Sequence, residues 1–110
     1  MKHSTPSPSK ADIARFEAFK TIGCIACRKH NVLNYHTECH HLLSGNKRRG
    51  HQFTIPLCPW HHRAFTHLSR EQARETWGPS LAEGSKPFHE RYGSDEELLK
   101  MTNELIEGKT

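Results

Sequence analysis

The chain has 110 residues, of which 34% are hydrophobic, and it carries a formal net charge of +4 at pH 7. Such a length favours one domain with a modest apolar core, which a bound metal ion would help to stabilise. No segment has the apolar length of a membrane span or the form of a signal peptide, so we expect a cytoplasmic protein with reduced cysteines. The positive charge favours a polyanionic partner, nucleic acid above all.

Polar and proline-rich residues open the chain, and residues 1–8 are predicted to be a flexible arm ahead of a single domain over residues 9–110. Ser9 and Asp12 have capping-box spacing, which predicts a first helix that Gly23 ends. Its apolar positions recur at near-helical spacing: Ile13, Phe16, Phe19 and Ile22. This stripe is expected to pack into the core.

The middle of the chain is predicted to form a β-hairpin. Its segments "NYHTECHHLL" and "QFTIPL" flank the basic, glycine-rich loop "SGNKRRGH". Phe53, Ile55 and Leu57 alternate with polar or turn-compatible residues, as in a half-buried strand. Pro56 limits pairing, which suits a strand end or a sheet edge.

Helices are expected in the rest of the chain. Pro59 fits the first turn of a helix that carries His61 and His62 and, if it is long enough, His67. Capping-box patterns begin two further helices, at Ser69 and at Ser94, within a C-terminal scaffold over residues 69–108.

Metal-ligating residues are concentrated between positions 24 and 67, which hold all four cysteines and eight of the ten histidines. A Cys-x-x-Cys pair and a Cys-x-x-His pair predict a structural zinc site, in the order of a treble-clef motif: Cys24, Cys27, Cys58 and His61. One alternative is that these cysteines are simply buried. Another pairs His36 with Cys39, but residues three apart on a strand face opposite ways.

Two adjacent histidine pairs indicate a second site. If His61 binds zinc, His62 is turned about 100° away from it around the helix. His40 and His41 end the first hairpin strand, and a strand that ends and twists there would direct both toward the helix with His62. Three imidazoles so arranged are suited to hold a divalent cation and a phosphate together.

The combined motif resembles the ββα-metal, or HNH, nucleases, and within them most closely the phage-encoded, RecA-dependent nuclease Ref family. The matching parts are "CIAC", "HHL", and a Gly-His pair ahead of "IPLCPWHH", between Gly23 and His67. The resemblance implies an α+β, zinc-stabilised ββα-metal domain, treble-clef-like, with its core at residues 23–68. It also implies that His40 and His62 bind a catalytic cation, Mg²⁺, Mn²⁺ or Zn²⁺, and that His41 is the general base.

The sequence departs from the HNH pattern at two places. The usual Asn falls near Phe53, so its loop-fixing or base-orienting role must pass to another residue, with three candidates: His51, Gln52 and Thr54. The further helix ligand falls at Thr66, and His67 lies one position beyond ideal helical alignment. His51 and His67 are therefore only candidate ligands of the catalytic metal.

A DNA endonuclease or nickase that hydrolyses phosphodiester bonds is the leading functional prediction. A neutral imidazole can take the proton of water, a cation can stabilise the phosphate charge, and the basic loop can contact the DNA backbone through Lys47, Arg48 and Arg49. The family resemblance adds a RecA filament as partner, in phage or prophage recombination. The alternatives are a zinc-stabilised DNA-binding module without catalysis and a protein-interaction adaptor. A thiol nucleophile at Cys39 is disfavoured, because this side chain is expected in the core.

Overall fold

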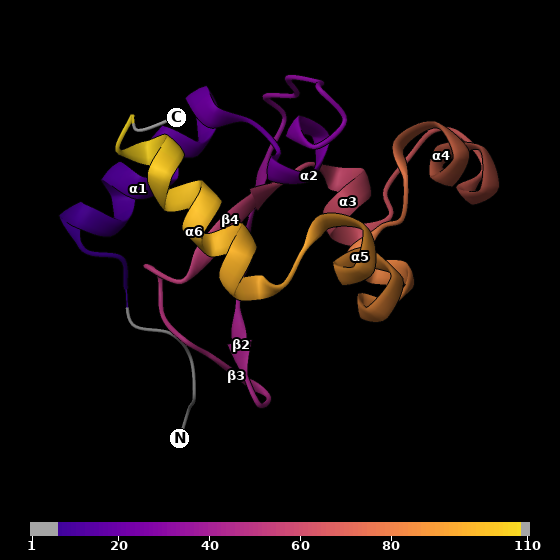
Figure 1. Cartoon of the computed structure of the whole chain (residues 1–110). Coiled ribbons are helices and arrows are strands. Elements are labelled where there is room, and N and C mark those ends of the chain that lie inside the picture. The colour runs from indigo at the N-terminus through magenta and orange to yellow at the C-terminus, as the bar shows by residue number, and fades with distance from the viewer. Residues whose placement is uncertain (1–6, 109–110) are drawn as a thin grey trace.

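The computed structural model describes residues 7–108 as an α+β fold, which confirms the predicted class (Figure 1). The predicted arm lies mostly outside these residues. In chain order the elements are α1 (Lys10–Ile22), α2 (Ile25–Arg28), β1 (Glu38–His41), β2 (Leu43–Ser44), β3 (Lys47–Arg48), β4 (Thr54–Leu57), α3 (Pro59–Arg63), α4 (Arg70–Trp77), the 3-10 helix η1 (Leu81–Glu83), α5 (Ser85–Tyr92) and α6 (Asp95–Ile106). Among the described residues, no helix is long and apolar enough to cross a membrane.

Helix α1 begins and ends where the sequence predicts. The Ser9 hydroxyl accepts from the Asp12 N–H at 3.1 Å, and the Asp12 carboxylate accepts from the Ser9 N–H at 2.9 Å. Gly23 ends the helix at φ 83°, and a Cβ there would lie 2.8 Å from the Asn34 carbonyl oxygen, so the turn requires glycine. Phe19 is buried, but Ile13 is 51% exposed, so the apolar stripe is shorter than predicted.

Strands β1 and β4 pair antiparallel, with His40 opposite Ile55 and His41 opposite Thr54. The short pair β2 and β3 continues the hairpin and projects away from the helices (Figure 1). The hairpin was predicted, but the half-buried alternation of its second strand was wrong. All four residues of β4 are buried, because helices α1, α2, α3 and α6 pack against it. Pro56 lies within this buried strand, opposite Cys39.

A buried arginine, which was not predicted, joins α1 to β4 and to α6. Arg15 is 7% exposed and donates to the Thr54 hydroxyl at 2.9 Å, to the Thr54 carbonyl at 2.6 Å and to the Asn103 side-chain oxygen at 2.8 Å. These three bonds satisfy a charge that would otherwise be costly to bury.

Helix α3 is too short to carry His67, which was the longer of the two predicted possibilities. It ends at Arg63, because Ala64 takes the left-handed conformation at φ 58° and ψ 32°. His67 therefore lies beyond the helix, in the segment that leads to α4. The predicted capping boxes do begin α4 and α6, whereas η1 and α5 were not predicted. Helix α5 brings the fully buried Phe88 and Tyr92 into the core.

Candidate functional site

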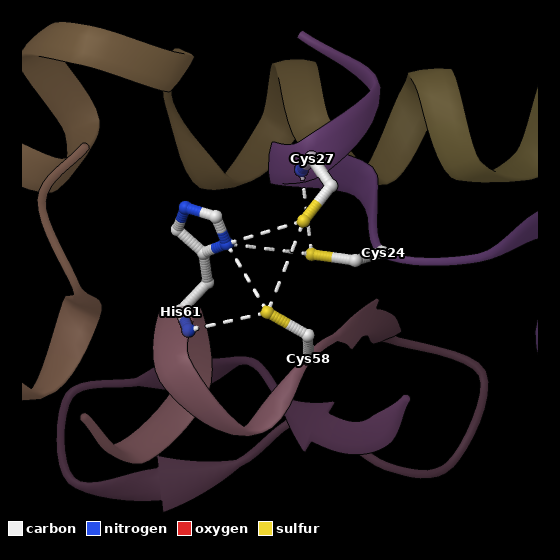
Figure 2. Close-up of side chains that lie close together, drawn as sticks. All are labelled: Cys24, Cys27, Cys58 and His61. Atoms are coloured by element: carbon white, nitrogen blue, oxygen red, sulfur yellow. Dashed lines mark hydrogen bonds between the residues drawn. The ribbon is translucent and has the colours of Figure 1, made fainter. Parts of the chain in front are cut away.

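The predicted zinc ligands meet at the beginnings of two short helices. Cys24 and Cys58 are the N-cap residues of α2 and α3, and each thiol accepts a backbone N–H three residues on, from Cys27 at 3.4 Å and from His61 at 3.5 Å. Cys27 and His61 then project from the first turn of each helix toward the same point (Figure 2). Among the described residues these four are the one group of three or more metal-ligating side chains that come together, and neither His36 nor Cys39 belongs to it.

The spacing of the four donor atoms fits a tetrahedral zinc ion. They all lie within 4.8 Å of one another. His61 Nδ1 is 3.3 Å, 3.6 Å and 3.7 Å from the sulfurs of Cys58, Cys27 and Cys24, and the sulfurs of Cys27 and Cys58 are 3.9 Å apart. A zinc tetrahedron with ordinary bond lengths has sulfur–nitrogen edges of about 3.6 Å and sulfur–sulfur edges of about 3.8 Å.

The electrostatics of the cluster also favour a bound cation. Hydrogen bonds from the thiols of Cys24 and Cys27 lower the pKa of Cys58, so that one sulfur is readily ionised. Burial lowers the pKa of His61, but hydrogen bonds to Cys27 and Cys58 outweigh it and raise that pKa to about 9. Burial raises the pKa of Cys24, so this thiol would ionise only with a cation bound beside it, as Zn²⁺ does for its thiolate ligands.

A hydrogen-bond chain fixes the ring of His61 from behind. Its Nε2 lies 2.7 Å from the Trp77 carbonyl oxygen, which can only accept, so this nitrogen carries the proton and Nδ1 is left for the metal. Tyr92 donates to the same carbonyl at 2.9 Å. Arg91 donates to Nδ1 of His30, so the other nitrogen of that ring donates to the Tyr92 hydroxyl at 2.6 Å. Tyr92 was not predicted, and no local pattern marks it as a partner of His61.

The second cluster brings His40 of β1 against His62 of α3. Their ring centroids are 5.2 Å apart, with planes inclined at 64°. Burial, with a smaller effect from His62, lowers the pKa of His40 to about 4, so this ring is neutral at pH 7. The Glu38 carboxylate lies 2.8 Å from His62 Nδ1 and also accepts from Arg63. Glu38 was not predicted, although it shares a strand face with His40 two positions later.

The structure separates the two adjacent histidines of β1, which the sequence analysis expected to turn the same way. The His41 Nε2 lies 3.1 Å from His51 Nδ1, and Phe16 of α1 packs edge-on against both rings. Burial, then Arg48 and His51, lower the pKa of His41. The charge of His62 also lowers it, so the His41 ring remains within electrostatic range of the other pair. His51, one of three candidates for the role of the missing Asn, is the one that contacts His41.

The remaining predicted residues occupy different places. His67 is exposed and lines a cavity of about 530 Å³ on the zinc side of α3, together with Trp60, Phe65 and Trp77. Lys47 and Arg48 are exposed in β3. Arg49 is ion-paired with Glu96 of α6.

Two further residues lie outside these clusters. His89 makes local contacts, with the Gly93 carbonyl oxygen at 2.9 Å and with Asp95 at 3.4 Å. Cys39 is half-buried, not in the core as expected, and burial raises the pKa of its thiol.

Fold and cluster together define a small α+β domain built around a Cys₃His site that can hold zinc. The chain belongs to the recombination enhancement, RecA-dependent nuclease family, whose family model matches residues 8–107. This confirms the resemblance to the RecA-dependent nucleases, and it makes the protein a nuclease of recombination, with DNA as the substrate that this activity implies. A search of curated proteins found no match.

Proposed function

We propose that this chain is a metal-dependent DNA endonuclease or nickase of the HNH type, formed by one domain over residues 9–110. It hydrolyses phosphodiester bonds, acts in phage or prophage recombination in the bacterial cytoplasm, and is directed by a RecA filament. Zn²⁺ in the Cys₃His cluster is structural. The observation that carries the proposal is the approach of His40 to His62, from two elements that are distant in sequence.

The geometry of this pair fits two ligands of one cation. An imidazole bound through one nitrogen places its ring centroid about 3.2 Å from the metal, so two such rings at about 105° have centroids about 5 Å apart. The observed 5.2 Å agrees with this value. A divalent cation in such a site supplies positive charge to the scissile phosphate and to the leaving oxygen. Neither histidine is a ligand of the Cys₃His cluster.

His41 is proposed as the general base. Its lowered pKa keeps the ring neutral at pH 7, the form that accepts a proton from the attacking water. His51 holds that ring through a contact of 3.1 Å and so takes the base-orienting role that an Asn has in other HNH nucleases. We therefore favour His40 and His62 over His51 and His67 as ligands of the catalytic metal.

The tip of the hairpin is proposed to contact the DNA backbone. Lys47 and Arg48 are exposed on β3, which pairs with β2, and β2 follows the strand that carries His41. Arg49 would join them only by exchanging its ion pair with Glu96 for a phosphate. Such contacts position the duplex without reading its sequence.

Cleavage assays on RecA-coated DNA and on free plasmid, with Mg²⁺ or Mn²⁺, test the proposal. We expect His41→Ala to abolish cleavage with the fold and the zinc content unchanged, and His40→Ala and His62→Ala to remove a second, weaker metal site as well. Full activity in His41→Ala would refute its role as the base. A protein that holds only one ion per chain and never cleaves would instead be the non-catalytic DNA-binding module.

A further inference from the structure

We propose that Glu38 is a positioning residue that fixes the proton of His62 on Nδ1 and thereby keeps His62 Nε2 free to bind the catalytic metal. The inference rests on the proposed function, in which His62 is a ligand of that metal. It assigns a role to a carboxylate that does not itself touch the metal or the substrate.

The tautomer follows from the contact itself. Glu38 Oε1 lies 2.8 Å from His62 Nδ1. An ionised carboxylate can only accept a hydrogen bond, so the histidine nitrogen that faces it must carry the proton. In the neutral ring the other nitrogen then has a free lone pair. Carboxylate–histidine–metal arrangements of this kind are common, because the carboxylate fixes the ring orientation and makes the imidazole more basic.

The carboxylate is held in place independently of the histidine. Arg63 Nε donates to both Glu38 oxygens at 2.9 Å, and Arg63 Nη2 lies 2.8 Å from Oε2. Two-oxygen contacts with a planar guanidinium fix the orientation of a carboxylate more strictly than a single bond does. The Arg63 guanidinium also stacks over the Phe65 ring, 4.8 Å from its centroid. One oxygen of Glu38 is thus directed at His62 by a residue that follows it in the same helix.

Strand geometry places this support next to the proposed metal site. Glu38 and His40 are two positions apart in β1, so their side chains leave the same face of the strand. That face meets α3, where His62 contacts Glu38 through Nδ1 and approaches the ring of His40. His40 would therefore bind the metal directly, and Glu38 would hold His62 through the ring nitrogen that does not bind it.

The alternative is that Glu38 only straps α3 to β1 through an ion pair. An ion pair that only holds the two elements together requires charge attraction, but it does not require the proton of His62 to be on one particular nitrogen. The tautomer of the folded protein therefore separates the two roles, and it can be measured without cleavage and without added metal.

The first test is ¹⁵N NMR of the imidazole nitrogens in the zinc-loaded protein, with His62→Ala to assign the signals and at a pH where the His62 ring is neutral. We expect the proton on Nδ1 in the unsubstituted chain. A proton on Nε2 would overturn the proposal. The tautomer is read in the unsubstituted chain, and His62→Ala serves only to assign its signals.

The second test compares Mn²⁺ binding, measured by electron paramagnetic resonance, in Glu38→Leu and in the matched control Glu83→Leu. Glu83 forms a similar ion pair with Arg74, at 3.0 Å, but contacts no histidine. We expect Glu38→Leu to weaken Mn²⁺ binding by about 10- to 100-fold, and Glu83→Leu to leave it unchanged. Equal binding in the two variants would overturn the role of Glu38.

The outcomes also separate this inference from the proposed function. If His62→Ala abolishes Mn²⁺ binding and cleavage while Glu38→Leu changes neither, the nuclease site stands and the role of Glu38 is refuted. If the unsubstituted chain binds no second metal, the proposed function fails, and with it the metal-positioning role.

Discussion

Removal of zinc should unfold the protein, not merely loosen one end of it. The donors of the Cys₃His cluster lie on α2 and α3, which have four and five residues. Isolated helices need about 12 to 15 residues to be even marginally stable, so these two depend on what binds their ends together. Structural zinc contributes about 10 to 16 kcal/mol in small zinc domains, whereas a whole domain has a net stability of about 5 to 15 kcal/mol. The metal-free chain is therefore expected near zero stability.

Circular dichroism melts with and without a chelator, with zinc counted by mass spectrometry, measure this effect. Cys24→Ser should reproduce the loss of the cooperative transition, and Cys39→Ser, which alters the one cysteine outside the cluster, should not. A zinc-free chain that melts within about 5 °C of the loaded one would contradict this prediction, since such a shift corresponds to only about 1 kcal/mol.

Three further predictions concern single side chains. Tyr92→Phe should lower the free energy of unfolding by about 1 to 2 kcal/mol in thermal melts, because His30 loses its hydrogen-bond acceptor. Zinc affinity should fall by less than about tenfold, since the Trp77 carbonyl still fixes His61. Loss of zinc would contradict this. His51→Ala should lower kcat by about 100-fold without changing Mn²⁺ affinity, because only the orientation of His41 is lost. Weaker Mn²⁺ binding in this variant would instead identify His51 as a metal ligand. In single-turnover assays, activity should fall as pH drops through the lowered pKa of His41, so the half-maximum should lie below the ordinary value of 6.5, and not above it.

Much of the fold could be predicted because its signals are local. Capping boxes at Ser9, Ser69 and Ser94 depend on residues three apart, and all three helices begin there. The burial of β4 could not be predicted in the same way. It depends on four helices that pack against the strand from distant parts of the chain, so alternation along the strand carried no information about them.

In the candidate site, too, the local features could be predicted and the features that depend on distant parts of the chain could not. The Cys₃His cluster could be predicted because paired spacing on two short turns leaves few other ways to arrange four donors. The direction of His41 could not, since it depends on where the chain returns after the hairpin loop and places His51. Arg49 was taken as a DNA contact from its neighbours alone, and only the position of α6 reveals its ion pair with Glu96.

The adjacent histidines of α3 make its orientation a shared property of two sites. His61 contributes to the Cys₃His cluster, and His62, one step around the helix, faces β1. A helix of five residues has no length over which to absorb a rotation, so any turn that improved one contact would misdirect the other. The left-handed Ala64 ends the helix immediately afterwards and keeps the downstream chain from extending it. The cluster that stabilises the fold thereby also sets the distance from His62 to His40, on which the proposed metal site depends.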